Sequence, residues 1–599
     1  MKRQRTFFQT LFVLVFALAI PASAADAAWT FTVSMARPAE HLFHVALRCE
    51  GMKGEMLDFK MPAWMPGFYR ILDYESNVSN FRAADSAGRA LPWEKVTRNA
   101  WRVVAGNAAV VMVEYDVFGN VNFAAQNFLD EKRAFIAPPG LFLHAAGQIR
   151  HPVTVVLDLP AGWTNIATGL DPVPGRPRTY RAPDFDVLYD CPILMGNQES
   201  LTFEVKGVPH QATLENIPET VDRARIAADL KKIVAAATGL IGDIPYKHYA
   251  FLLIGAGNGG IEHANSAACL FNGKSLADEK GYLGWLSYIA HEYFHCFNVK
   301  RIRPLALGPF DYEAENYTDL LWVSEGLTVY YEDIVLVRAG LMTPAQYLGR
   351  MAGAMTRFEG ASGHHYQAAT EASLQTWGGS GMGGDRATTI SYYDNGAMLG
   401  AMLDLAIRHA NGNRKSLDDV MRALYRTYDR EKKRGFTDAE FRTACERAAG
   451  VPLDEVFEYA STTKDVDYAK YFAYGGISVE AALQDAPGAF LGVNTQSING
   501  VLTITGVAPG SPAMAAGLAA GDRLLELDGA KAATKVLSDL LAAKKPGETV
   551  KIRFSRNGAE QIAEITLGRN TKPIYTVAPM PGPGPLPAVL FKDWLRKML

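Results

Sequence analysis

A histidine, a glutamate and a second histidine with the spacing of a metallohydrolase site lie in the segment SYIAHEYFHCF, residues 287–297. On a helix, His291 and His295 at positions i and i+4 project from one face at the separation that a shared metal ion requires. Glu292 then lies beside the open position of that metal, where a general base for a metal-bound water is needed. The pattern predicts a metal-dependent hydrolase in preference to two unrelated histidines on a helix.

A third ligand is expected downstream, because a hydrolytic zinc site has three protein ligands and an exchangeable water. The segment LLWVSEGLTVYYEDIVL, residues 320–336, has helical apolar spacing and contains Glu325, thirty residues after His295. Glu332 lies seven residues further on the same face, and only one of the two need bind the metal. The phrase WxxEGxT favours Glu325. Two histidines and a carboxylate with an open position favour zinc, one ion per chain, over other divalent ions.

HEYFH followed by WVSEGLTVYYED resembles the gluzincin metallopeptidases, and specifically the glycyl aminopeptidase family. The segment AWMPGFYRILDYE, residues 63–75, is similar to the WxPGxY signature of that family's N-terminal domain. The resemblance covers nearly the whole chain after its first residues. It implies a β-rich N-terminal domain, a thermolysin-like catalytic domain and a C-terminal PDZ domain.

The segment GNGGIEHANS, residues 257–266, gains meaning from this resemblance. It is similar to the glycine-x-x-glutamate segment of aminopeptidases, which implies that Glu262 pairs with the α-ammonium group of the substrate. Gly259 and Gly260 would let the backbone approach an extended peptide closely. The alternative is a glycine-rich turn with a solvated Glu-His pair.

The resemblance also implies a tyrosine that donates a hydrogen bond to the oxyanion of the tetrahedral intermediate. ISYYDNGAMLGAMLDLAI, residues 390–407, contains a tyrosine-x-x-glycine pattern that begins at Tyr393. Asn395 stands where the familiar form often has lysine, so the choice between Tyr392 and Tyr393 is open, with Tyr393 preferred.

APGSPAMAAGLAAGDRLLELDG, residues 508–529, resembles the core of a bacterial PDZ domain. Upstream, Leu491, Gly492 and Val493 resemble the loop whose backbone N–H groups receive a peptide carboxylate. The resemblance implies a site for the C-terminus of a peptide or protein. A packed accessory domain without a ligand of its own is the alternative.

The periodicity of the chain defines the elements that must position these residues. Short alternating runs predict a β-rich domain over residues 25–205, and a mainly helical pattern follows over 206–475, with a long glycine-rich loop over 359–386. The PDZ domain is expected at residues 489–569. The composition of residues 570–599 predicts a Pro/Gly-rich spacer followed by a short C-terminal helix. The fold class is therefore multidomain α+β.

Composition and the first residues indicate where the protein works. The 599 residues are 48% hydrophobic and carry a net charge of −3, which gives no basic surface for nucleic acid. Five cysteines in a chain of this length are too few for a fold that is held together mainly by disulfide bonds. Residues 1–24 combine basic residues, an apolar run and Ala22-Ser23-Ala24, the pattern of a cleaved signal peptide. We expect export to the periplasm of a Gram-negative bacterium, with no stable membrane span after cleavage.

The leading hypothesis is an exported zinc aminopeptidase that releases small N-terminal residues, glycine or alanine, from peptides with a free N-terminus. The glycine and alanine preference is implied by the resemblance alone. A PDZ-assisted zinc endopeptidase is the first alternative, and Glu262 discriminates because an N-terminal anchor makes acetylated peptides poor substrates. The second alternative is a non-catalytic peptide-binding scaffold, which the intact His291, Glu292 and His295 disfavour.

Overall fold

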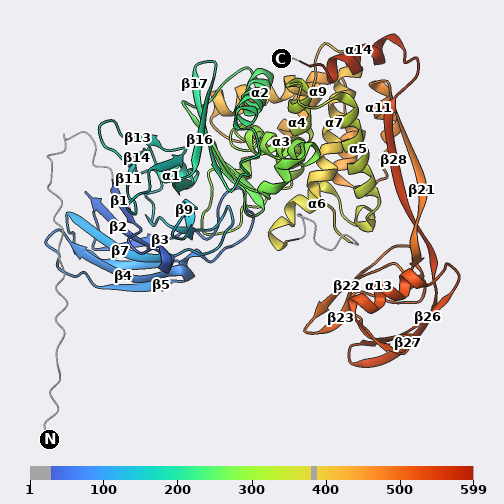
Figure 1. The fold of residues 1–599 in the computed structure, drawn as a ribbon, viewed down its shortest axis with the longest axis horizontal. Helices are drawn as coiled ribbons and strands as arrows, with labels where there is room; N and C mark the ends of the chain where they lie inside the picture. The colour runs from blue at the N-terminus through green and yellow to red at the C-terminus, as the bar shows by residue number, and fades with distance from the viewer. Residues whose placement is uncertain (1–28, 380–387, 598–599) are drawn as a thin grey trace, which may run out of the picture.

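The computed structural model describes residues 29–379 and 388–597, so the predicted signal peptide, residues 1–24, lies outside the described part of the chain. Within these ranges, buried side chains form three hydrophobic cores, one each for a strand-rich N-terminal domain, a mainly helical middle domain and a small C-terminal unit. Figure 1 shows the first two domains side by side and the third at the end of a two-stranded ribbon. This is the multidomain α+β architecture that the sequence predicts.

A seven-stranded sheet is the base of the N-terminal domain. Its strands alternate between buried and exposed residues, which gives the sheet one apolar face. β1 pairs antiparallel with β2 and parallel with β11. In spatial order the strands are β13 (Asp171–Pro172), β14 (Thr179–Ala182), β11 (Val153–Asp158), β1 (Trp29–Ser34), β2 (Leu42–Glu50), β7 (Val110–Phe118) and β4 (Val78–Asp85).

Two smaller sheets complete this domain. Their strands are β10 (His144–Ala145), β3 (Met56–Lys60), β6 (Ala100–Val104) and β5 (Trp93–Thr97) in one, and β12 (Asn165–Thr168), β15 (Ile193–Gly196), β9 (Arg133–Ile136) and β8 (Phe128–Leu129) in the other.

The segment AWMPGFYRILDYE, between β3 and β4, fastens the N-terminal domain to the middle domain. The buried indole of Trp64 donates a hydrogen bond to the carbonyl oxygen of Asp311 at 2.7 Å. The same ring packs edge-on against Trp377, with 5.0 Å between ring centroids. The contact between a buried and a half-buried indole joins the two domains firmly.

A five-stranded sheet begins the middle domain, in the order β16 (Glu199–Val205), β17 (Val208–Glu215), β18 (Tyr249–Ile254), β20 (Ser266–Leu270) and β19 (Gly259–Glu262). β17, β18 and β20 are parallel, and β19 runs antiparallel to β20 at the edge. β16 forms a hairpin with β17, and its apolar side chains pack on the core of the middle domain. Residues 199–205 therefore belong with the middle domain, although the sequence pattern placed them in the N-terminal one.

Helices form the rest of the middle domain and share one large core with this sheet. Aspartate side chains cap the first turns of α2 and α3, and a Thr437–Glu440 capping box begins α9. The main helices are α2 (Arg223–Ile241), α3 (Glu279–Phe294), α4 (Leu327–Arg338), α5 (Pro344–Glu359), α7 (Tyr392–Ala410), α8 (Leu417–Leu424), α9 (Asp438–Ala449), α10 (Asp454–Ser461) and α11 (Tyr468–Tyr474).

The stretch 359–386 is more regular than the predicted long loop. Its described part contains helix α6 (Ala369–Leu374) and short 3-10 turns at Ser362–His365 and Thr376–Gly378. Ala369 and Ala372 are fully buried, so apolar contacts order a segment whose glycine content suggested a loop.

The C-terminal unit is inserted into a long ribbon and is not simply appended to the chain. β21 (Ile477–Phe490) pairs antiparallel with β28 (Gly568–Pro579), which corrects the predicted Pro/Gly-rich spacer over 570–579. These residues form a strand because they pair along β21. Between the two strands lie β22 (Val493–Ile498), β23 (Val501–Val507), β24 (Arg523–Leu527), α13 (Thr534–Ala543), β26 (Thr549–Arg556) and β27 (Ala559–Thr566).

Helix α14 (Pro585–Trp594) brings the chain back to the middle domain. Trp594 is fully buried, and its indole donates a hydrogen bond to the hydroxyl of Tyr330 at 2.8 Å. That hydroxyl in turn donates to Asp404 at 2.7 Å. Both strands of the ribbon are therefore anchored on the middle domain.

All five cysteines lie in the described ranges, buried and with free thiols. In those same ranges, we find no helix whose length and apolar character would let it cross a membrane.

Replacement of Trp594 by alanine should destabilise the middle domain by about 3–5 kcal/mol, because it opens a cavity and leaves the Tyr330–Asp404 pair without the indole donor. Chemical denaturation followed by tryptophan fluorescence measures this change. Val589→Ala on the exposed side of the same helix is the control and should change stability by less than about 0.5 kcal/mol. Equal effects of the two substitutions would contradict the anchoring role of α14.

Candidate metal centre and active-site cleft

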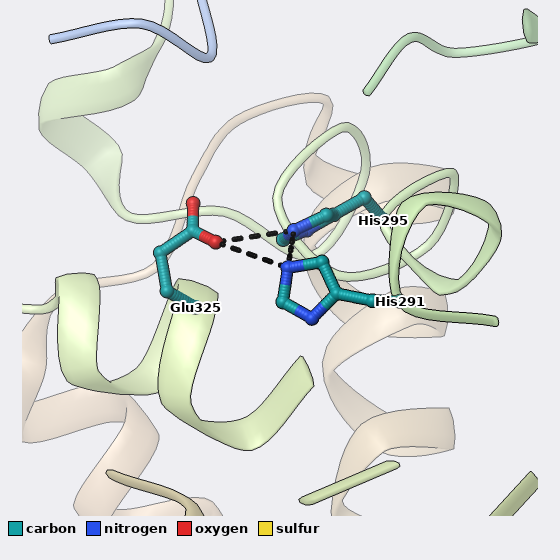
Figure 2. A group of neighbouring side chains, drawn as sticks. All are labelled: His291, His295 and Glu325. Carbon is teal, nitrogen blue, oxygen red and sulfur yellow. Dashed lines mark hydrogen bonds and ion pairs between the residues drawn. The ribbon is translucent and has the colours of Figure 1, made fainter. Parts of the chain in front are cut away.

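Three predicted ligands converge in the middle domain, as Figure 2 shows. His291 lies in the last turn of α3, and His295 caps the end of that helix. Their Nε2 atoms are 3.0 Å apart. The Oε2 atom of Glu325 lies 3.1 Å from the Nε2 of His295 and 3.6 Å from the Nε2 of His291. All three side chains are buried or nearly so.

The outer nitrogens of both imidazoles are held by acceptors. The Nδ1 of His291 lies 2.8 Å from Glu332 Oε2, and the Nδ1 of His295 lies 2.8 Å from the carbonyl oxygen of Asn298. Since a carboxylate and a carbonyl can only accept, each Nδ1 carries the proton and each Nε2 presents a lone pair. Two imidazole lone pairs and a carboxylate oxygen therefore meet at one point, and a divalent cation such as zinc fits this donor set.

The two glutamates of the second helical segment have different places. Glu325 faces the two Nε2 atoms, whereas Glu332 lies behind His291. Ser287 and Arg350 hold Glu332 Oε1, with contacts of 2.8 and 3.2 Å. Of the two carboxylates, the structure therefore brings only that of Glu325 to the two Nε2 atoms, because seven residues, or two helical turns, separate them.

A π-helical turn and a glycine contact position Glu325. Residues Trp322–Gly326 form the π-helix that precedes α4, a feature that often marks functional sites. A Cβ on Gly326 would lie 2.4 Å from the Cα of Gly396 in α7, and a Cβ on Gly396 would lie 2.5 Å from the carbonyl oxygen of Trp322. Only glycine permits this approach, which brings the start of α7 to the ligand cluster.

The two tyrosines at the start of α7 have different surroundings. Tyr392 is fully buried, with its hydroxyl 3.1 Å from Thr376 Oγ1. Tyr393 lines the cleft, and its ring centroid lies 6.2 Å from that of His291. Burial, followed by the charge of Glu325, raises the pKa of Tyr393 and keeps its hydroxyl protonated.

Glu292 is a buried carboxylate on the floor of the cleft. Burial raises its pKa to about 7; His291 and His295 oppose this shift, and Glu262 and Glu325 add to it. A Cβ on Gly260 would lie 2.3 Å from Glu292 Oε1, so the glycine at this position makes room for the carboxylate. A carboxylate whose pKa lies near neutrality suits a general base.

Glu262 ends the edge strand β19 and lines the same cleft. Its carboxylate is nearly fully buried, and a Cβ on Gly67 of the N-terminal domain would lie 2.9 Å from its Oε2 atom. Gly259 lies further out on β19, where a Cβ would contact the ring of Phe123 at 3.0 Å. The N-terminal domain therefore covers the end of the cleft that holds Glu262.

Sequence reasoning missed that the N-terminal domain supplies part of the cleft wall. Phe68 and Phe123 line the cleft and pack edge-on, with 4.9 Å between centroids. Tyr69 is buried against the middle domain, and burial, then the charges of Glu325 and Glu262, raise its pKa. The WMPGFY phrase was the available signal, since it contains Phe68 and Tyr69 beside Gly67.

The predicted PDZ loop leads into β22 of the C-terminal unit, which Figure 1 shows at the end of the ribbon away from the helices of the middle domain. Leu491 is buried, Gly492 has a left-handed φ of 84°, and Val493 begins β22. β22 is an edge strand of its sheet. These are the features that addition of an extended peptide requires.

Comparisons with known proteins agree with this organisation. Residues 30–197 match the Peptidase M61 N-terminal domain, residues 284–399 match the M61 glycyl aminopeptidase domain, and residues 489–567 match a PDZ domain. A search of curated protein sequences returned no match.

Solved structures include similar chains. An aminopeptidase N family protein from Idiomarina loihiensis is 26% identical with a TM-score of 0.81, over 95% of this chain and 100% of that one. An M1 zinc metallopeptidase from Deinococcus radiodurans is 11% identical with a TM-score of 0.47, over 74% of this chain and 95% of that one.

The two M61 matches fall on the N-terminal and middle domains, and the zinc cofactor that this family implies has a fitting donor set in the middle domain. The chain therefore carries both the N-terminal and the catalytic domain of the M61 glycyl aminopeptidases and is a zinc aminopeptidase with a C-terminal PDZ domain.

Proposed function

We propose that this aminopeptidase is exported and releases glycine or alanine from peptides with a free N-terminus, with one zinc ion held in the cleft by His291, His295 and Glu325. The observation that carries the proposal is the buried carboxylate of Glu262, which lines the same cleft as the ligand cluster and is covered by Gly67. A peptide that places its α-ammonium group at Glu262 has its first peptide bond near the metal ligands.

Each catalytic role follows from a side chain already placed in the cleft. Bound zinc would supply Lewis acidity that activates water and polarises the scissile carbonyl. Glu292 takes the proton of the attacking water and passes it to the leaving amine. Tyr393 donates a hydrogen bond to the carbonyl oxygen as charge develops on it. Glu262 holds the substrate's α-ammonium by a charge-assisted hydrogen bond.

The preference for small residues has support in the cleft wall. Phe68, Phe123 and the backbone of Gly259 and Gly260 lie around the end at which Glu262 binds the substrate N-terminus. Bulky aromatic rings there leave room for a hydrogen or a methyl group more readily than for a long side chain. The free edge of β19 can hold the peptide backbone in extended form.

The endopeptidase alternative requires a cleft that is open past the first substrate residue. The contact between Gly67 and Glu262 opposes this, since the N-terminal domain covers that end of the cleft.

The PDZ domain is proposed to bind the C-terminus of a peptide or protein through Leu491, Gly492 and Val493. Residues 1–24 have the pattern of a signal peptide, which supports export to the periplasm.

Loss of the Glu262 charge should remove the discrimination between free and blocked N-termini. With Ala- and Gly-anilides, Glu262→Gln should lower kcat/KM by about 10–100-fold, because one charge-assisted hydrogen bond is lost. N-acetylated peptides should be poor substrates for the wild type. Glu315→Gln, an exposed carboxylate outside the cleft, is the matched control. Efficient cleavage of acetylated peptides by the wild type would support the endopeptidase instead.

Glu292→Gln should retain zinc and lose about 100- to 10,000-fold in kcat, since the amide cannot accept the proton. In the wild type, kcat/KM should fall as pH drops through about 7 or somewhat below, because protonation of Glu292 removes the base and a bound cation lowers its pKa. Metal analysis and a pH–rate profile measure both effects. A variant that loses its zinc, or an acid limb well above pH 8, would contradict the assignment.

Glu332→Ala should weaken zinc affinity by about 10–100-fold, because His291 loses the acceptor that orients its ring. Competition with a chromogenic chelator measures the affinity. Glu332→Gln keeps an acceptor oxygen and should lose less. Unchanged affinity in Glu332→Ala would show that the carboxylate does not orient His291.

A further inference from the structure

A second group of metal-ligating side chains lies away from the cleft, where the end of α5 meets the segment before α11. One donor atom each from His364, His365 and Asp465 lies within 4.8 Å of the other two. About one hundred residues separate the histidines from the aspartate in the sequence, so the fold brings them together. The donor set, two imidazoles and a carboxylate, has the same chemistry as the cluster in the cleft.

The surroundings of His364 prepare its Nε2 atom as a ligand. Its Nδ1 lies 2.6 Å from the carbonyl oxygen of Ala361, which can only accept, so Nδ1 carries the proton and Nε2 presents a lone pair. The imidazole packs against Phe358 on one side and His365 on the other, with ring centroids 5.5 and 3.9 Å away. Its side chain is only 11% exposed, so the ring is already oriented.

A second carboxylate stands beside this cluster. Glu359 Oε2 lies 3.5 Å from His364 Nε2, and its other oxygen accepts a hydrogen bond from the hydroxyl of buried Tyr468 at 2.8 Å. Glu359 is thus held in place by α11 and can serve as a fourth ligand or as a partner of His364. Two imidazoles and a carboxylate form the group, and the second carboxylate beside His364 adds the negative charge and the further donor that Zn²⁺ prefers.

We propose that His364, His365 and Asp465, with Glu359 beside them, bind a second zinc ion that has a structural role. Ligands of a tetrahedral zinc lie about 3.3 Å from one another. His365 and Asp465 are exposed and free to close the remaining distance, whereas His364 and Glu359 are fixed.

Such an ion would brace the segment that leads to the active-site tyrosine. Gly363, in the same 3-10 turn as the two histidines, packs on the backbone of Thr389, where a Cβ would lie 2.1 Å from the carbonyl oxygen. Gln367 accepts a hydrogen bond from the backbone N–H of Ile390 at 2.9 Å. Residues 389 and 390 immediately precede α7, which carries Tyr393. The ion therefore links the start of α7 to the segment before α11.

Metal stoichiometry tests the proposal without reference to activity. Untagged full-length mature protein is equilibrated with Zn²⁺ alone, desalted and measured by atomic emission. The wild type should hold about two zinc ions per chain, and His365→Ala and Asp465→Asn should each hold about one. Glu325→Ala should also lose one ion, from the cleft cluster, and so separates the two sites. His409→Ala, which removes a histidine that is stacked on Tyr474 and belongs to neither group, should keep two.

A wild-type content of one ion that His365→Ala and Asp465→Asn leave unchanged would overturn the second site and leave the cleft site intact. Circular dichroism identifies a variant that fails to fold. Because Asp465 is exposed and asparagine nearly preserves its shape, Asp465→Asn provides the test if a histidine variant is unstable. Retention of two ions in both variants would also overturn the proposal.

Discussion

Three electron-pair donors meet without a proton between them in the middle of this protein, and their mutual repulsion is the constraint on which the site depends. Burial of two imidazole nitrogens and a carboxylate oxygen is costly unless a cation joins them. Hydrogen bonds that the two Nδ1 atoms donate to Glu332 and to the Asn298 carbonyl fix the protons on the far side of the rings, so tautomerisation cannot relieve the repulsion. The packing of α3 against α4 holds the three donors together at the point where a cation fits.

Glycine contacts set the distances around that cluster. The approach of Gly326 to Gly396 brings α7 and its tyrosine to the ligands, and Gly260 leaves space for the carboxylate of Glu292. Gly67 makes the corresponding contact between the N-terminal domain and Glu262. At each point a β-carbon would collide with backbone or with a functional carboxylate. Glycines from three different parts of the chain thus shape the cleft, because a residue with a β-carbon would not fit at these positions.

The insertion of the PDZ domain gives the molecule a direct physical link between its C-terminal unit and its cleft. β28 packs on α5, where the backbone N–H of Tyr575 donates to Thr356 Oγ1 at 3.0 Å. The same helix carries Arg350, which contacts Glu332 and Asp333 behind the ligand His291. Helix α14 holds the returning chain through Trp594. A domain that the sequence suggests is a tail is therefore tied to the catalytic domain at both ends.

The sequence by itself determined the chemistry and most of the elements. Local periodicity, which can be read directly from the order of residues, determines the i, i+4 histidines, the alternating strands and the buried run of β18. Tertiary structure decided which groups meet. It placed Glu325 at the cluster and Glu332 behind it, turned Tyr393 into the cleft and Tyr392 into the core, and made a strand of residues 570–579. It also brought Phe68 to the cleft, and Tyr69 close to the charges of Glu325 and Glu262, from another domain. These outcomes depend on packing between residues that are distant in the chain, where close approach and burial, rather than spacing, select the neighbour.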